Sequence, residues 1–429
     1  MAGRNIHCVS AMSRLYYVGR LLIITTITFK ALTQTMSPSA SNLVSLRMQR
    51  FKVLSAGIAS LVLMLGIARF AYTPMLPLMQ NQAGLGIAEG GWLAAFNYLG
   101  YFCGALIAAS ISNLNTKDRL YRLGLIVALA TTLGLGLTQN FWLWSLLRFF
   151  AGLSSAAGLL LGSGLVMHWL LRHKLRTELG IHFMGMGAGI FLSALFVYLL
   201  EPHLNWQLQW FWLTAAGCLL AVPAWLWLPK PDVSGYAVDG SKLQDQPPTR
   251  TFLRVFMLAY FCAGTGYAII ATFIVAHVEL MSVKPGMGMV VFMVIGLAAA
   301  PACILWDLIA RKIGDLNALL AAFILQFAGM LIPLLSPSLT WTLVGAALFG
   351  ATFIGVVSLV LTMAGRYYPT RPAKMMGKMT LSYGVAQMAA PAMAGVLAQW
   401  SGSYSLSIGI ASGFMFCGCI LVYWLARQQ

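Results

Sequence analysis

Residues 53–77 read VLSAGIASLVLMLGIARFAYTPMLP, a run of 25 residues in which Arg69 is the one charged side chain. A helix needs roughly 20 apolar residues to cross the hydrocarbon core of a bilayer, so this run is long enough for one span. Eleven more such runs follow, and the predicted spans are 53–77, 91–112, 121–138, 141–166, 178–200, 206–228, 253–276, 286–306, 316–335, 341–364, 375–399 and 404–426. The sequence therefore predicts an all-α membrane protein with twelve transmembrane helices.

The composition fits this prediction and excludes a water-soluble globule. The chain has 429 residues, of which 60% are hydrophobic and only 9% charged, too few to cover a soluble surface. A net charge of +17 suggests nucleic-acid binding only where basic residues share a water-facing surface, and here they lie in short gaps between apolar runs. We expect the lipid bilayer and a small-molecule substrate as partners, no nucleic acid, and a monomer.

The basic residues also predict which way the chain is threaded. Every second gap, counted from the segment before the first span, is rich in Lys and Arg. From residue 47 on, these gaps and the first residues of the spans that follow them hold 20 Lys and Arg, against Lys284 alone in the other gaps. Cytoplasmic loops retain positive charge, so both termini are predicted to be cytoplasmic, in a bacterial inner (plasma) membrane.

The first 46 residues form a predicted N-terminal extension. Its apolar run, Leu15–Phe29, is short for a span and is interrupted by Arg20. We expect residues 1–46 to be disordered or to precede the true start, with Met36 and Met48 as alternative starts.

A polar stretch over residues 229–251 contains four prolines and two glycines and predicts a flexible cytoplasmic linker. It separates six predicted helices in 47–228 from six in 252–429. The two parts echo each other weakly: Asp118-Arg119 follows the second span, and Asp307 with Arg311 follows the eighth. Two parallel six-helix bundles joined in this way are the architecture of the major facilitator superfamily.

The most specific string is Gly66-Ile67-Ala68-Arg69-Phe70-Ala71-Tyr72-Thr73-Pro74-Met75-Leu76-Pro77. It resembles the YbfB/YjiJ branch of major facilitator transporters, and the resemblance extends from about residue 46 to the end. The resemblance implies twelve helices and alternating access, but no particular substrate.

Sequence motifs for other chemistry are missing. No GxxxxGK[ST] or HExxH string occurs, and the six histidines and seven cysteines lack metal-ligand or disulfide spacing. We expect no cofactor, no metal and no enzymatic activity.

Charge within the hydrocarbon is costly, which makes Arg69 the first candidate for a functional residue. On a helix it shares a face with Tyr72 and Thr73, and Pro74 interrupts the helix just beyond them. The alternatives are that Arg69 reaches toward the outer surface or pairs with a backbone carbonyl.

Arg148 is the second candidate, because Arg148-Phe149-Phe150-Ala151-Gly152 resembles the RxxxG motif in the fourth helix of many superfamily members. Both a structural tie to the first helix and a role in substrate or proton coupling remain open. No span carries a carboxylate at its middle, so two arginines at a similar depth predict an anionic substrate.

Polar stripes on otherwise apolar helices supply the other candidates. With Arg69 and Arg148, the predicted substrate-binding residues are Tyr72, Thr73, Asn97, Tyr267, Tyr383 and Gln387. Interhelical hydrogen bonding is the alternative for each stripe. For Asp118, Arg119, Asp307 and Arg311 we expect a gating or structural role, and His182 is either a proton-coupling group or a packed core residue.

The predicted function is secondary active transport of a small solute, which the arginines suggest is an organic anion. Export of hydrophobic compounds is the alternative within transport, and a membrane-embedded enzyme or sensor is the alternative from another class.

Overall fold

The computed structural model describes residues 38–111, 113–173, 175, 179–231, 247–281, 286–336, 338–367 and 372–428. The chain divides into two compact units, Met1–Lys52 and Val53–Gln429, and the description below concerns the second. Residues 38–46 of the predicted extension belong to a helix, and the rest of the extension lies outside the described residues. The middle of the predicted linker, residues 232–246, also lies outside them.

The first span is built from three consecutive segments rather than one regular helix. These are α2 (Pro38–Leu61), the π-helical η1 (Val62–Phe70) and α3 (Tyr72–Ala83). The fourth span is also interrupted, as α6 (Phe141–Ala156), η2 (Ala157–Gly162) and α7 (Ser163–Arg172). The other helices of the first half are α4 (Ile87–Ser110), α5 (Leu114–Leu137), α8 (Leu179–Leu200) and α9 (Trp206–Leu226).

The second half contains six helices. They are α10 (Arg250–Met281), α11 (Met287–Ile313), α12 (Asp315–Leu335), α13 (Leu339–Tyr367), α14 (Pro372–Ser401) and α15 (Ser405–Ala426). Eleven spans among the described residues are long and apolar enough to cross a membrane, and α11 gives a twelfth as two parts bent by 45°. The bend falls beside Pro301, which removes a backbone donor from the helix interior. The predicted all-α fold with twelve spans is confirmed.

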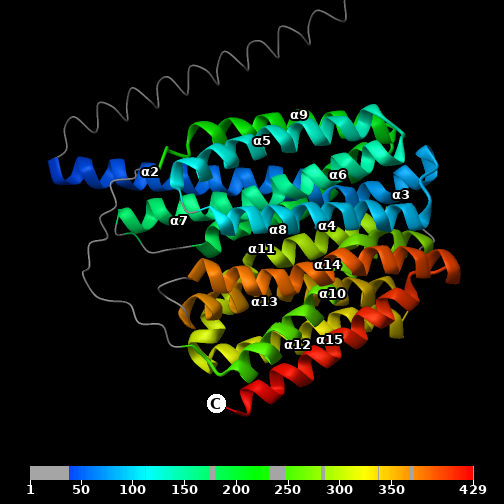
Figure 1. Cartoon of the computed structure of the whole chain (residues 1–429). Helices are drawn as coiled ribbons and strands as arrows, with labels where there is room; N and C mark the ends of the chain where they lie inside the picture. Colours follow the sequence, from blue (N-terminus) through cyan, green and yellow to red (C-terminus); the bar gives the residue numbers. More distant parts are fainter. Residues whose placement is uncertain are drawn as a thin grey trace, which may run out of the picture. The chain divides into compact units, whose positions relative to one another are not determined.

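The helices form two neighbouring groups, one containing segments up to α9 and the other containing α10–α15 (Figure 1). The groups meet mainly through α4 with α14 and α8 with α11, and also through α3 with α10. Glycine allows these close approaches: a Cβ on Gly91 of α4 would lie 2.5 Å from the carbonyl oxygen of Pro391, and one on Gly187 of α8 would collide with the backbone of Ala300. Membrane helices associate through such small residues because lipid offers no hydrophobic driving force between them.

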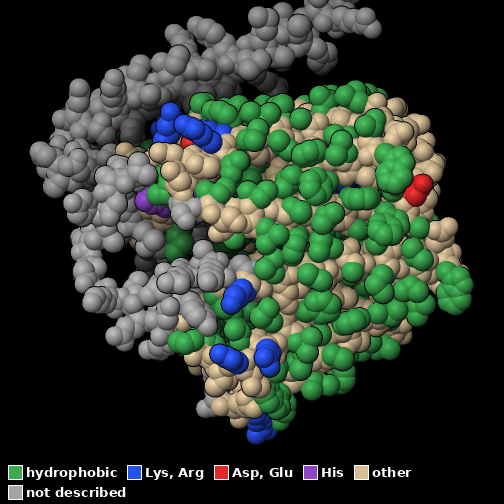
Figure 2. All heavy atoms as spheres, viewed as in Figure 1, with side chains coloured by type: hydrophobic (Ala, Val, Ile, Leu, Met, Phe, Trp, Pro, Cys, Tyr) green, Lys and Arg blue, Asp and Glu red, His purple; other side chains and the backbone are tan. Residues whose placement is uncertain are grey.

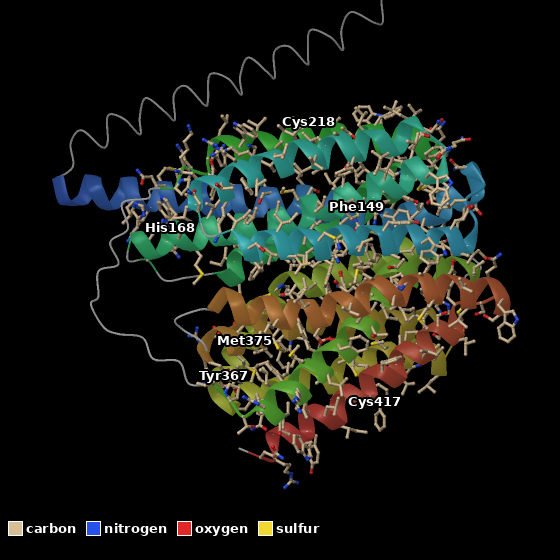
Figure 3. All side chains as sticks on the ribbon, viewed as in Figure 1. Phe149, His168, Cys218, Tyr367, Met375 and Cys417 are labelled. Carbon is tan, nitrogen blue, oxygen red and sulfur yellow. The ribbon has the colours of Figure 1, made fainter. Side chains whose placement is uncertain are left out.

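Glycines also bring helices together within the first group. Gly100 of α4 lies against the backbone of Phe149 on α6, at the position labelled in Figure 3. Gly158 and Gly189 allow similar contacts, because an added Cβ would lie 2.9 Å from Met64 Sδ at the first and 2.8 Å from Gly66 Cα at the second. The second arginine helix, α6, is thus held close to α4, and η1 is held close to α8.

The outer flank of the helices is apolar, as lipid contact requires. Figure 2 shows hydrophobic side chains over most of the visible face, with Lys and Arg gathered at the end where the C terminus lies. Leu219 and Trp400 are 76% and 82% exposed, values that suit a lipid-facing surface.

Candidate functional site

The first helix changes its hydrogen-bond pattern beside the site. In η1 the backbone follows the wider π pattern, and the N–H of Ala71 donates to Gly66 O five residues earlier at 2.8 Å. Pro74 then lacks the N–H that an α-helix would direct to Phe70. The segment therefore offers carbonyl groups to other partners, and π segments of this kind are frequent at functional sites.

Side chains of α6 take up these carbonyls. The guanidinium of Arg148 donates from Nη1 to Ala68 O at 3.1 Å and to Arg69 O at 3.4 Å, and from Nη2 to Arg69 O at 3.4 Å. Ser155 Oγ donates to Met64 O at 2.8 Å. Arg148 is only 2% exposed, and its Cζ also lies 4.3 Å from the ring centroid of Tyr72. These hydrogen bonds support the interpretation that Arg148 binds the backbone of the first helix to α6.

Arg69 has a different environment. It is 6% exposed, and its Cζ lies 4.5 Å from the ring centroid of Tyr101, 4.7 Å from that of Tyr98 and 5.4 Å from that of Phe70. Its Nε, like that of Arg148, is buried without a hydrogen-bond partner. In the described part of the chain the ion pairs join other residues, such as Asp118 with Arg122. Arg69 is thus a buried cation that aromatic faces surround and no described carboxylate neutralises.

A small cavity lies at this point between the two helix groups. Its lining residues are Arg69, Phe70, Tyr72, Thr73, Ala94, Asn97, Tyr98, Arg148, Ala271 and Thr272. The space that the centre of a water molecule can occupy is about 10 Å³, which is room for about one water. Thr73 Oγ1 donates to Ala271 O at 2.6 Å, so a hydrogen bond from α3 to α10 closes the cavity.

Aromatic rings continue from the cavity into the second half. Tyr98 meets Tyr267 edge to face, with centroids 6.4 Å apart. Tyr267 stacks on Phe353 at 5.2 Å and on Tyr383 at 5.9 Å, and Tyr383 stacks on Tyr260 at 4.4 Å. Tyr98 and Tyr267 therefore link the two groups of helices next to Arg69.

Five of the predicted substrate-binding residues come together in this cavity: Arg69, Tyr72, Thr73, Asn97 and Arg148. Tyr267 and Tyr383 lie behind Tyr98 in the aromatic series, and Gln387 is buried one turn farther along α14 with its Oε1 unpaired.

Three of the predicted donors already serve helix packing. Tyr72 Oη donates to Gly90 O at 2.9 Å, and Asn97 Nδ2 donates to Arg148 O at 2.9 Å. Thr73 donates across the groups as described above. In this closed arrangement all three side chains make hydrogen bonds between helices, which was the alternative to substrate binding.

Sequence reasoning overlooked Tyr98. The stripe formed by Asn97 and Tyr101 contains the signal, because Tyr98 lies at i,i+3 from Tyr101 on the same broad helix face. Its contact with Tyr267 joins residues far apart in the chain and has no signal in the sequence.

The predicted gating residues lie away from the cavity. Asp118 pairs with Arg122 at 3.0 Å, and Arg122 also donates to Trp225 O and Leu228 O at the end of α9. Arg119 is exposed. Asp307 pairs with Arg311 at 2.5 Å on an exposed turn of α11. Each aspartate thus pairs with an arginine one helical turn away, and a role of these residues in gating stays a prediction.

His182 is fully buried within the first group of helices. Its Nε2 lies 2.8 Å from Ser163 Oγ, and its Nδ1 has no hydrogen-bond partner. The imidazole occupies the space that a side chain at Gly57 would take. This position is separate from the cavity lining, and proton coupling through His182 stays a prediction.

The fold, the midspan cavity between two helix groups and the buried cation define a secondary transporter of the major facilitator class. The model of the family described as "Uncharacterised MFS-type transporter YbfB" matches residues 61–423, and the chain belongs to this family. The expected YbfB-like resemblance is thereby confirmed, and the family and its structural neighbours are transporters rather than enzymes.

Similar proteins agree with this assignment at low identity. The chain is 32% identical over 97 residues to the uncharacterized MFS-type transporter YceJ of Bacillus subtilis, covering 23% of this chain and 25% of YceJ. It is 24% identical over 164 residues to a probable sphingolipid transporter, spinster homolog 1, of Arabidopsis thaliana, covering 38% of this chain and 33% of that protein. The match to the uncharacterized MFS-type transporter YcaD of Salmonella enteritidis is 26% identical over 160 residues and covers 37% of this chain and 41% of YcaD.

Solved structures show the same fold. The crystal structure of a point mutant of the nucleoside transporter NupG superposes with a TM-score of 0.70 at 11% identity, covering 87% of this chain and 99% of NupG. A second NupG structure gives 0.66 at 11% identity, covering 88% of this chain and 99% of NupG.

Proposed function

We propose that this transporter moves a small organic anion across the membrane by alternating access, and that Arg69 binds the anionic group. The observation that carries the proposal is the difference between the two buried arginines. Both arginines line the cavity, and the Nε of each is buried without a hydrogen-bond partner. The Nη groups of Arg148 donate to backbone carbonyls of the first helix, whereas the guanidinium of Arg69 lies against the faces of aromatic rings. A carboxylate or phosphate would supply the missing negative charge, and guanidinium geometry suits either group.

Alternating access is supported by the position of the cavity. It lies between two helix groups that meet through α4 with α14, α8 with α11 and the Thr73 hydrogen bond to α10. Space for about one water is too small for an organic solute. Substrate entry therefore requires the two groups to separate on one side, as in rocking of one bundle against the other.

The test is uptake and counterflow in proteoliposomes with a panel of carboxylates, phosphate esters and quaternary ammonium compounds. Replacing Arg69 with Gln should lower anion uptake about 10- to 100-fold, because a charged hydrogen bond contributes about 1.5 to 3 kcal/mol. Arg69→Lys keeps the charge but loses the planar fork, so its affinity should fall between those of the wild type and Arg69→Gln.

Arg254→Gln is the matched control, since Arg254 is exposed near the start of α10. Equal transport of a cation by the wild type and by Arg69→Gln, without any anion transport, refutes the proposal. Export of hydrophobic compounds is the competing outcome. It is favoured by the aromatic walls and by the spinster-type relative, which is named for sphingolipids. It predicts transport of neutral apolar solutes that is indifferent to Arg69→Gln.

A further inference from the structure

The surface around Arg69 is unusually rich in aromatic rings, and they come from both helix groups. Tyr98 and Tyr101 of α4 each cover the guanidinium, at 4.7 and 4.5 Å from Cζ to ring centroid. Tyr267 of α10 meets Tyr98 from the other group at 6.4 Å and 80°. All three tyrosines are 7% exposed or less. A charged group is thus placed directly beside an edge-to-face ring pair that spans the two halves.

The rings behind Tyr267 share nearly one orientation. Tyr267 lies at 18° to Phe353 and at 28° to Tyr383, and Tyr383 lies at 28° to Tyr260. Stacked neighbours hold the plane of Tyr267, so the ring has little freedom to collapse into a space that opens beside it. The second half therefore presents a preformed aromatic edge toward Arg69.

Separation of the helix groups removes the contact between Tyr98 and Tyr267. We propose that a flat ring of the substrate takes its place, so that the transported anion is a small aromatic carboxylate whose carboxylate binds Arg69 and whose ring lies between Tyr98 and Tyr267. This inference rests on the proposed function, since it names the anion class for the same site.

An aromatic acid and a saturated acid of the same size differ in what they gain at this site. Both would bury similar apolar area, but ring pairs add an interaction beyond area, and this corresponds to roughly 2- to 12-fold in affinity. An aromatic carboxylate also keeps the ring close to its charge, as required by the 4.7 Å between Arg69 Cζ and the Tyr98 centroid.

The experiment compares benzoate, cyclohexanecarboxylate and benzamide in proteoliposome counterflow. Benzoate and cyclohexanecarboxylate differ in the ring, and benzoate and benzamide differ in the charge. The wild type should bind benzoate about three- to tenfold more tightly than cyclohexanecarboxylate and should not carry benzamide.

Variants at the ring pair test the geometry. Tyr98→Leu and Tyr267→Leu should bring the ratio between the two acids close to one while anion transport continues, and Tyr98→Phe should keep the ratio. Tyr101→Leu is the matched control, because Tyr101 covers the same guanidinium but forms none of the ring pairs found among the described residues. It should weaken both acids equally.

A second control, Tyr423→Leu, changes a half-exposed tyrosine on α15 and should alter nothing. Thermal unfolding of each variant identifies any that fail to fold. If Tyr98→Leu does, Tyr267→Leu still tests the ring pair, and Tyr98→Phe shows that the hydroxyl is not what sets the ratio. Equal affinity of the wild type for benzoate and cyclohexanecarboxylate, both dependent on Arg69, overturns the aromatic inference and leaves the anion proposal standing. Transport of neither acid, with uptake of neutral or cationic solutes, overturns both.

Discussion

At the scale of single residues, Arg69 and Arg148 are both buried in the same cavity but have different surroundings. Arg148 donates to two carbonyls of the first helix, while the guanidinium of Arg69 lies among aromatic rings. Both arginines were recognisable from the sequence, because charge within an apolar run is rare. The sequence did not predict which of the two arginines would bond to the backbone, since this depends on which backbone carbonyls the π segment η1 leaves free.

This difference predicts opposite effects on stability. Arg148→Gln leaves the carbonyls of Ala68 and Arg69 buried without a strong donor, at about 1 to 3 kcal/mol each. Arg69→Gln removes a buried charge with no described counter-ion and should leave stability equal or higher. Thermal unfolding of the two variants in detergent, with Arg254→Gln beside them, checks this order. A larger loss for Arg69→Gln than for Arg148→Gln would reverse the assignment of the two roles.

At the scale of helices, the spans were predictable and their interruptions were not. Twelve apolar runs identify twelve spans because length in lipid is set by the bilayer. The π segment η1 depends on Arg148 and Ser155 of another helix, so the composition of the first run does not reveal it. The turn between α10 and α11 is another such feature, since Glu279 Oε atoms accept from the N–H groups of Gly286 at 3.1 Å and Gly288 at 2.7 Å.

That turn predicts a pH dependence through Glu201, which follows α8. Burial raises the pKa of Glu201 above its ordinary value of 4.5, and the nearby Glu279 raises it further. Among the described residues, Glu279 of α10 is the charged group that acts on Glu201. Tyr198 of α8 and Gly286, just before α11, lie beside them. A raised pKa means that the closed arrangement binds the proton more tightly than an open, solvated one. Protonation of Glu201 therefore stabilises the closed arrangement, and this stabilisation is fully present below pH 4.5. It is lost as the pH rises through the raised pKa of Glu201.

The accessibility of a cysteine beside Glu201 to a thiol reagent measures this pH dependence of closure. With a cysteine at Tyr198 in a cysteine-free background, labelling by a membrane-impermeant thiol reagent should rise with pH more steeply than the thiol chemistry alone predicts. Glu201→Gln fixes the neutral form and should leave only the thiol's own pH dependence. The same slope in both proteins would exclude Glu201 as the titrating group.

At the scale of the whole transporter, the closed arrangement depends on glycines where the two helix groups meet. The fold class followed from the repeat of apolar runs, but the pairing of α4 with α14 and of α8 with α11 joins segments too far apart for local patterns to reveal. The same holds for the hydrogen bond from Thr73 to Ala271, which are 198 residues apart. Function at the level of transport was therefore predictable, and the shape of the site was not.

A side chain at Gly91 should hold α4 and α14 apart. Its Cβ would lie 2.5 Å from Pro391 O and 3.1 Å from Gly395 Cα, both backbone atoms that have little room to move. Gly91→Leu should lower transport about 5- to 150-fold, since overpacking costs roughly 1 to 3 kcal/mol in the closed state alone. Gly413→Leu on α15 is the control, because nothing lies within 4 Å of a Cβ there. Normal transport by Gly91→Leu would mean that the two helices need not approach this closely during the cycle.

The π segment divides the first span into two parts, and among the described residues only the second part also bonds to the other group of helices. Before it, Gly57 packs against His182 inside the first group of helices, and after it, Thr73 bonds to Ala271 in the second group. Each residue of an α-helix turns by about 100°, so a stretch of wider winding resets the direction in which all later side chains point. The part after the π segment therefore contacts both groups of helices, through Tyr72 with Gly90 of α4 and Thr73 with Ala271 of α10, and Arg69 lies in the π segment just before it.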